Sequence, residues 1–438
     1  MLYKKSYVAI ILFLLPALNL YAQETKTFTL KDVIDLGIKN SKQLMLSKAR
    51  IDEAVAATKE ATQQRLPDAS ISTNYLQFSN AKVKSYGKDT TAIAPLGVNS
   101  ALYGTANVSY PLFSGFKIKY GIQSAEYLER ATMLDADNDK QEVVLNTIAA
   151  YVNLYKANIT ARLVEENLVQ SRQRDTDFAN LEKNGMLARN DLLKAQVQTS
   201  QFELGLIDAQ NAIQLAQVNM NLMLGLPEST KLVLDSASLK APTEIKTLEE
   251  YETFAEQNRY DVKALDERKK AADAGIHAAK GDYYPSLGIS AGYIAADLPK
   301  FITITNAFNL GVGIKYSISS IWKTGAKVDQ AKARAQQVQV SEDMLFDDIH
   351  LSINQAYEDY FSSIKKIDVL NKEVEQTAEN YRISKNKYNN SLLTLTDLLD
   401  ADVDQLRSKL NLTLAKADAY MSYQTLQQKA GLLNEQQF

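Results

Sequence analysis

The sequence predicts a mainly α-helical fold with membrane β-strands, in which internally duplicated long antiparallel α-helical hairpins with coiled-coil spacing carry four transmembrane β-strands per chain. Three observations support this prediction: only 17 Gly and 8 Pro occur in 438 residues, long runs without Pro are rich in Ala, Gln, Leu, Lys and Glu, and the same order of elements occurs twice. Few helix-breaking residues favour long helices, and a repeated order indicates duplication. We therefore expect an elongated chain.

Residues 1–22 have the pattern of a secretory signal peptide. Two lysines precede an apolar run from Tyr7 to Leu20, and the small residue Ala22 follows it. A basic start, an apolar middle and a small final residue are typical of such signals. The alternative, a membrane anchor, is disfavoured because the run is short and Pro16 interrupts it. Cysteine is absent, which excludes disulfides, thiolate metal sites and thiol nucleophiles.

The first structural repeat is expected over residues 23–232. A helical pattern runs from Leu30 to Leu66, and two β-strands follow at about 69–80 and 100–113. Helix-forming residues then continue from about 117 to 183 to a hairpin tip at about 184–191, and a return helix ends at Leu226. Because each helical residue adds about 1.5 Å, the hairpin is roughly 100 Å long. Its apolar stripe Val144, Ile148, Tyr151 and Tyr155 has coiled-coil spacing.

A linker at 233–247 separates this repeat from a second one at 248–438. The separation of 218 residues is the same from Asn40 to Asn258 as from Pro67 to Pro285, and a separation of 206 residues relates Tyr151 to Tyr357, Asp191 to Asp397 and Gly225 to Gly431. We also match Gly115 with Gly325, both placed where a strand gives way to a long helix. The second repeat is thus expected to hold a helix, strands at about 285–297 and 304–318, and a hairpin with its tip at about 390–397.

The strands indicate assembly. Apolar and polar residues alternate in each of them, and a strand of about 10 residues is long enough to cross a membrane when tilted. Leu310, Val312, Ile314 and Tyr316 are the expected lipid-facing residues of the last strand. Four strands do not close a barrel, and open sheet edges are not tolerated in hydrocarbon. Several chains are therefore expected to share one barrel.

Several motifs carry a family resemblance: L-K-D-V-I-D-L-G-I-K-N-S from Leu30, R-L-P-D-A from Arg65, P-L-F-S-G from Pro111, G-L-P from Gly225, and the two tips. In this order and spacing they resemble the TolC-like outer-membrane efflux proteins. The resemblance implies a homotrimer with a 12-stranded barrel in the outer membrane of a Gram-negative bacterium and a periplasmic tunnel of 12 helices. It implies a passive exit duct of a tripartite efflux or type I secretion system. The partners would be a periplasmic adaptor (membrane fusion protein), an inner-membrane RND or ABC transporter and outer-membrane lipid.

The resemblance also implies roles for residues near the tips. Asp397 and Asp400 match acids that narrow the pore in this family, and Asp404 extends the row along one helix face. Tyr388 and Asp191 match residues whose contacts hold the gate, whereas Leu393 stands where the family has a basic gate residue. Repeated around a threefold axis, the acidic row is expected to make the channel prefer cations.

Local alternatives exist for these residues. Thr394 and Asp397 also fit a helix N-terminal cap, a role that does not extend to Asp400. Apolar residues at the tips suit docking of the adaptor or, equally, a hydrophobic contact at a helix C-terminus. The expected docking residues are Gly185, Met186, Leu187, Ser391, Leu392 and Leu393.

Other function classes have less support. A periplasmic coiled-coil adaptor is the alternative, but it should carry one hairpin and a compact β module. The sequence shows no nucleophile constellation, no phosphate-binding loop and no metal-ligand spacing, since His277 and His350 are isolated on polar helical patterns. No enzyme activity, cofactor, metal or nucleic-acid partner is therefore expected.

Overall fold

The computed structural model describes residues 26–83, 96–235, 239–242, 244–299 and 302–434. The first half contains β1 (Lys26–Phe28), α1 (Leu30–Asn40), α2 (Lys42–Gln63), β2 (Asp68–Val83), β3 (Leu96–Phe113), α3 (Lys117–Lys183) and α4 (Arg189–Leu224). The second half contains β4 (Leu232–Leu234), α5 (Leu248–Asn258), α6 (Tyr260–Lys280), a 3-10 turn (Gly281–Tyr283), β5 (Ser286–Leu298), β6 (Ile302–Lys315), α7 (Ser320–Asn389) and α8 (Leu395–Lys429). The predicted signal peptide lies outside the described residues. None of the helices in these ranges has the length and apolarity needed to cross a membrane.

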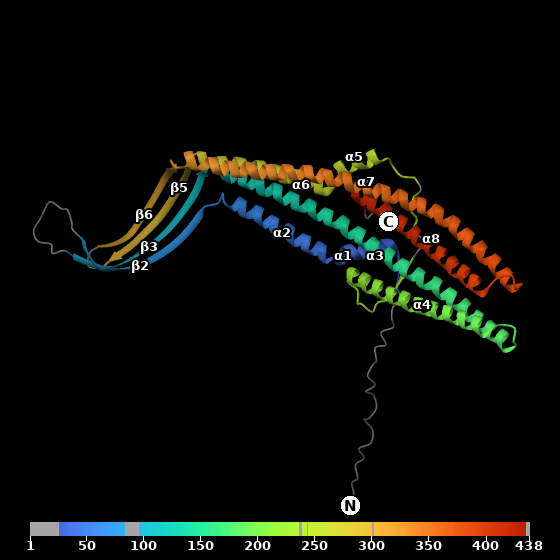
Figure 1. Ribbon diagram of the computed structural model, residues 1–438. Helices are drawn as coiled ribbons and strands as arrows, with labels where there is room; N and C mark the ends of the chain where they lie inside the picture. The colour runs from blue at the N-terminus through green and yellow to red at the C-terminus, as the bar shows by residue number, and fades with distance from the viewer. Residues whose placement is uncertain (1–25, 84–95, 236–238, 243, 300–301, 435–438) are drawn as a thin grey trace, which may run out of the picture.

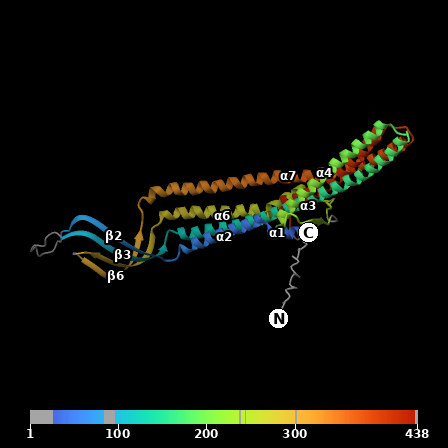
Figure 2. The same ribbon diagram turned by 90° about the horizontal axis from the view of Figure 1, so that it is seen from below.

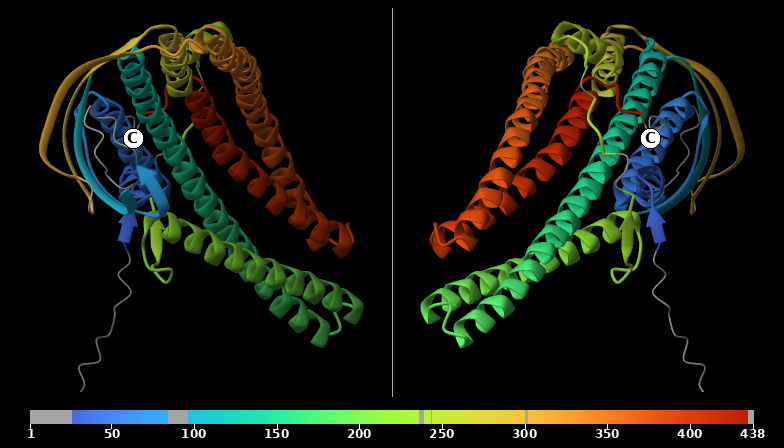
Figure 3. Two further views of the ribbon diagram at one scale, coloured as in Figure 1. Left: turned by 90° about the vertical axis from the view of Figure 1, so that its left-hand side faces the viewer. Right: turned by 90° about the vertical axis from the view of Figure 1, so that its right-hand side faces the viewer.

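Two long helical hairpins dominate the molecule. Helix α3 has 67 residues and pairs with α4, and helix α7 has 70 residues and pairs with α8. Both hairpins point away from the strands (Figures 1 and 2), and each forms its own helix pair when viewed end-on (Figure 3). Val144, Ile148 and Tyr151 of the predicted stripe are buried, and Tyr155 packs against them. The predicted fold class is confirmed.

The helix predicted from Leu30 to Leu66 is interrupted. Helix α1 ends at Asn40, and the Ser41 hydroxyl accepts a hydrogen bond from the Leu44 amide at 3.3 Å, which caps the start of α2. The second half has the same break at Arg259, between α5 and α6. The prediction of one continuous helix was wrong here. Serine is a favoured N-cap residue, so Ser41 starts a new helix and the chain changes direction between the two.

In each half of the chain, the end of the first short helix is hydrogen-bonded to the end of the return helix of the long hairpin. The Asn40 amide donates to the carbonyl that ends α4 at 2.6 Å, and the Arg259 guanidinium donates to the carbonyl that ends α8 at 3.1 Å. Gly225 and Gly431 follow these carbonyls with φ of 67° and 69°, a conformation that favours glycine. A Cβ on Gly431 would lie 2.9 Å from the Arg259 amide nitrogen, and one on Gly225 would lie 3.0 Å from Asn40 Cβ.

The equivalence of Gly115 and Gly325 was wrong. Gly115 precedes α3 with φ of 64°, whereas Gly325 lies inside α7 beyond its start at Ser320. The corresponding turn of the second half is built from Ser317 and Ser319, whose hydroxyls are 2.9 Å apart. A single glycine is a weak register marker because it occurs in helices as well as in turns.

The four long strands form one antiparallel sheet in the order β2-β3-β5-β6. The register places directly opposed residues on the same face of the sheet. The apolar face contains Ala106, Val108 and Tyr110 of β3, Leu287, Ile289, Ala291 and Tyr293 of β5, and Phe308, Leu310, Val312 and Ile314 of β6. The opposite face carries the polar and small rows Ser70–Asn107–Gly292–Asn309 and Asp68–Ser109–Ser290–Gly311. The sheet therefore has two chemically different surfaces.

Two buried tyrosines hold the segment between the halves. Tyr151 of α3 donates a hydrogen bond to the Asp235 carbonyl, and Tyr360 of α7 donates one to the Pro242 carbonyl. Just before Asp235, β4 pairs in parallel with β1. Part of this pairing falls inside the predicted linker, where no strand was expected because three residues carry too little periodicity to be detected.

Candidate functional site

The two hairpin tips have the same backbone turn. Gly185 and Ser391 adopt left-handed conformations with φ of 71° and 58°. The next amide, of Met186 or Leu392, donates back to a carbonyl near the helix end at 2.8 Å in both tips. This is the Schellman arrangement, which ends a helix by satisfying its last carbonyl groups. The tips are thus well-defined turns.

The apolar residues predicted for adaptor docking divide into two groups. Met186 is 66% exposed and Leu392 is 75% exposed, so neither makes the hydrophobic contact that usually accompanies this turn. Leu187 instead packs against the core between the tips, and Leu393 is half-buried. Gly185 and Ser391 are exposed. The structure therefore favours a surface role for Met186 and Leu392 and a packing role for Leu187.

The acidic row lies on the exposed side of α8. Asp397 caps this helix: its amide donates to the Thr394 hydroxyl at 3.2 Å, and the hydroxyl donates to its carboxylate at 2.6 Å. Asp400 is exposed and has no ion pair within the described part of the chain. Asp404 is exposed as well, with its carboxylate 3.7 Å from Arg407. Capping accounts for Asp397 but leaves Asp400 without a structural partner.

The predicted gate residues Tyr388 and Asp191 are close enough to interact electrostatically, but no hydrogen bond joins them in the part of the chain that the structure describes. Burial, and secondly the negative charge of Asp191, raise the pKa of Tyr388 above its usual value. The Tyr388 ring packs 5.9 Å from that of Phe178, and the Asp191 carboxylate lies 3.9 Å from Lys194. Lys194 also donates to the Thr396 hydroxyl at 3.2 Å, which joins the hairpins. A basic residue does link the tips, although it comes from α4 and not from position 393.

A buried ion pair that sequence reasoning missed lies farther along the same helices. Arg174 of α3 contacts the Asp402 carboxylate of α8 at 2.9 Å, with side-chain exposures of 13% and 6%. Arg174 also donates to Ser171 and to Gln198, each at 3.1 Å, and Gln198 donates to the Leu399 carbonyl at 3.2 Å. Breaking a buried pair by removing one partner typically costs ~3–5 kcal/mol.

One signal in the sequence pointed to this pair. Asp402 lies three or four residues from Leu398, Leu399 and Leu406, and so belongs to the apolar stripe of α8 and not to the acidic row. Burial of these leucines confirms that stripe. An acid on an apolar stripe predicts a buried partner.

The predicted lipid-facing residues are exposed on the apolar face of the sheet, with one exception. Leu310, Val312 and Ile314 are between 69% and 80% exposed. Tyr316 is exposed too, but β6 ends at Lys315, so its assignment to the strand was wrong. The apolar alternation continues past the residue at which the sheet pairing stops, and alternation alone does not mark that end.

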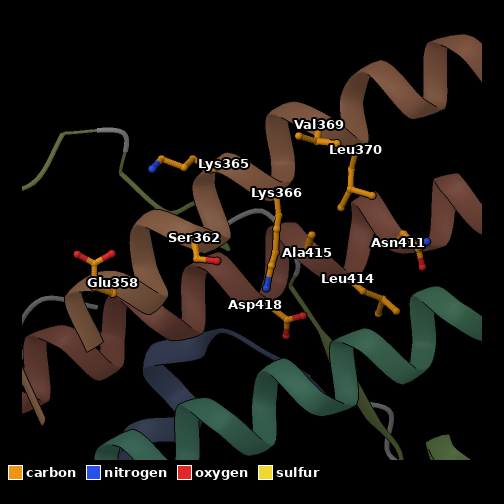
Figure 4. A pocket seen from close by; sticks show the side chains of 10 residues that line it. All are labelled: Glu358, Ser362, Lys365, Lys366, Val369, Leu370, Asn411, Leu414, Ala415 and Asp418. Carbon is orange, nitrogen blue, oxygen red and sulfur yellow. The ribbon is translucent and has the colours of Figure 1, made fainter. Parts of the chain in front are cut away.

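A groove of about 720 Å³ follows the second hairpin between α7 and α8. Its lining combines apolar residues such as Val369 and Leu414 with the charged Lys366 and Asp418, whose side chains point toward one another (Figure 4). Asp418 also pairs with Lys156 of α3 at 2.5 Å. The groove therefore offers a surface of mixed polarity between the two antiparallel helices.

Comparison with known proteins relates most of the chain to one protein family. The family model described as outer membrane efflux protein matches residues 33–226 and 254–432. The "Outer membrane efflux protein BepC" of Brucella suis biovar 1 is 23% identical over 350 residues, which cover 78% of this chain and 72% of that protein. The "Toxin and drug export protein A" of Aggregatibacter actinomycetemcomitans is 21% identical over 416 residues, which cover 89% of this chain and 83% of that protein.

Solved structures share the fold. The CmeC outer membrane channel of Campylobacter jejuni superposes with a TM-score of 0.76 at 16% identity, covering 93% of this chain and 88% of that one. The outer membrane protein VceC of Vibrio cholerae superposes with a TM-score of 0.75 at 19% identity, covering 92% of this chain and 96% of that one.

Proposed function

Because the chain belongs to the outer membrane efflux protein family, we propose that it is the outer-membrane channel of a tripartite efflux or type I secretion system. Three copies form a passive exit duct with a barrel in the outer membrane and a helical tunnel in the periplasm. The duct is gated at the hairpin tips and docks to a periplasmic adaptor and an inner-membrane RND or ABC transporter. The observation that carries the proposal is the sheet with one apolar and one polar face, continued by two long hairpins.

The sheet supports a shared barrel. Its outer strands β2 and β6 each have a partner on one side only within the described chain, and most residues of 68–79 and 302–315 are exposed. An unpaired edge in hydrocarbon costs several kcal/mol for each unsatisfied backbone group. Pairing β6 of one copy with β2 of the next removes both edges, and it keeps the apolar face toward lipid and the polar rows toward the lumen.

The helices support the same assembly. Helix α4 exposes apolar residues at near-heptad spacing, and α7 exposes others. They are Leu193, Val197, Leu204, Leu215 and Leu222 of α4, and Met344 and Leu351 of α7. Such exposed stripes are typical of helices that pack against another chain. In a closed ring of three copies, α4 of one chain faces α7 of its neighbour.

The tips support gating and docking. In a trimer the exposed acids Asp397, Asp400 and Asp404 of three α8 helices converge, which concentrates negative charge at the narrow end. Met186 and Leu392 then form an exposed apolar rim, and the groove between α7 and α8 accepts a helix of the adaptor. A Met186→Asp, Leu392→Asp variant should lose adaptor crosslinking, and crosslinking that survives in it would contradict the rim. Crosslinking left intact by a charge swap at the exposed Arg189 would likewise count against docking at the tip.

The assembly itself is tested by fractionation. The full-length protein should sediment with the outer membrane and migrate in unheated gels at the mass of three chains, then at the mass of one chain after boiling. A monomer in the periplasmic fraction would contradict the proposal and favour the adaptor alternative.

A further inference from the structure

Strand β6 reverses its alternation near the end of the sheet that is farthest from the helices (Figure 1). Ile294 and Ala296 of β5 are two positions apart. Their partners on β6, Ala307 and Ile304, are three positions apart, so β6 contains one extra residue. This is a β-bulge, and such an insertion re-aims the side chains beyond it. Asn306, within the bulge, has φ of 57°, a left-handed conformation that asparagine tolerates better than most residues.

The bulge is an integral part of the sheet. The Asn306 amide donates a hydrogen bond to the Tyr293 hydroxyl at 3.3 Å. The Tyr293 and Phe308 rings pack on the apolar face with their centroids 4.9 Å apart. Pairing between β5 and β6 then continues beyond the bulge as far as Ile302. The reversed alternation therefore belongs to the folded sheet and not to a frayed strand end.

Beyond the bulge, the otherwise polar face of the sheet carries large apolar side chains. The register places five of them there, which we call the apolar collar: Leu76 of β2, Ile294 and Leu298 of β5, and Ile302 and Ile304 of β6. All except the half-buried Leu298 are between 37% and 46% exposed. No charged residue shares these rows in the described part of the sheet. Exposed apolar side chains that lie together are typical of surfaces that contact another molecule.

The opposite face of the sheet is polar at the same level. Asp297 of β5 is opposed to Thr303 of β6, whose hydroxyl donates to the Asp297 carboxylate at 2.7 Å. A charged side chain that faces hydrocarbon is costly. This end of the sheet is therefore expected beyond the hydrocarbon of the membrane, and contact with lipid does not explain the apolar collar on the other face.

We propose that the apolar collar is a binding site inside the barrel, at its end away from the helices, for small organic molecules with an apolar body. The inference rests on the proposed function, because closure of the barrel turns this face toward the lumen. A hydrated ion or an extended polypeptide would lose hydrogen bonds to water against an uncharged apolar lining. An apolar body instead gains free energy by covering it. The collar therefore favours the apolar class of cargo.

Block of the channel by tetraalkylammonium ions tests the site. Tetrabutylammonium and tetramethylammonium carry the same charge and differ in the size of their apolar body, so the acidic row at the tips attracts both alike. We expect tetrabutylammonium, added on the barrel side of a planar bilayer, to reduce the single-channel current at concentrations at which tetramethylammonium does not. Equal reduction by the two ions would overturn the proposal.

A matched pair of variants locates the site. Ile302→Thr with Ile304→Thr makes the lining more polar, whereas Ile302→Val with Ile304→Val keeps it apolar. Threonine and valine are both β-branched and suit a strand. Half block of the threonine variant should need an about fivefold higher tetrabutylammonium concentration than half block of the valine variant, because apolar contact is lost at two positions in each chain. Equal concentrations for the two variants would contradict binding at the collar.

Cysteine labelling tests the direction of these side chains without measuring block. The chain has no cysteine, so each variant carries a single thiol. In lipid vesicles, Ile304→Cys should react with a charged, membrane-impermeant thiol reagent, whereas Leu310→Cys on the apolar face is the matched control and should stay unlabelled. The opposite pattern would sink the assignment of the collar to the lumen. Absence of conductance in the parent protein would instead contradict the proposed function, because labelling is measured without current.

Discussion

Placing glycine at Ser391 and serine at Gly185 is expected to change the stability of the two hairpin tips in opposite directions. Ser391 has φ of 58° and Gly185 has φ of 71°, and a Cβ on Gly185 would meet no atom within 4 Å. A left-handed conformation costs a residue with a Cβ roughly 1 kcal/mol, a cost that glycine avoids. Ser391→Gly should therefore stabilise the second tip, and Gly185→Ser should destabilise the first by a similar amount.

The magnitude follows from the same geometry. About 1 kcal/mol changes a local opening equilibrium by about fivefold. The reporter amides are those of Leu392 and Met186, which donate to their helix-end carbonyls at 2.8 Å. Hydrogen exchange measured by mass spectrometry on the assembled protein should be about fivefold slower at Leu392 in Ser391→Gly, and about fivefold faster at Met186 in Gly185→Ser.

Each variant serves as the control for the other, because its unchanged tip should exchange at the parental rate. Changes of the same sign in both tips, or none in either, would refute the reasoning that the backbone conformation limits tip stability.

Three further outcomes are expected. Asp397→Ala with Asp400→Ala should reduce cation preference in bilayer reversal potentials, and an unchanged preference would remove the acidic row from the pore. Asn40→Ala should lower the unfolding temperature, since the carbonyl ending α4 loses a partly buried donor at 2.6 Å, a loss of about 1–3 kcal/mol; an unchanged melting curve would contradict this. Hydrogen bonds from Lys117 and Lys327 lower the pKa of Asp282, so its stabilisation is complete above the unfolded-state pKa and is lost as pH falls through the lower folded value. Asp282→Asn should then flatten the acid limb of a stability profile, and an unaltered limb would count against it.

The candidate site residues differ in how far the sequence predicted them. The tips were found because Gly185 and Ser391 interrupt long periodic patterns at matched positions, and the acidic row was found because its spacing follows one helix face. Asp402 was overlooked among neighbouring acids, although it occupies the apolar stripe. The link through Lys194 was missed because it joins residues about 200 positions apart.

By itself the sequence determined the lengths of the hairpins, the alternation of the strands and the internal duplication. These depend on local propensity and on periods of 3.6 and 2 residues, which neighbouring positions carry. The tertiary structure alone decided which acid is buried and that β1 pairs with β4. Such outcomes depend on the direction from which a distant segment approaches: Asp402 is buried only because the first hairpin brings Arg174 against that face of α8, whereas Asp400, two residues away, stays in solvent.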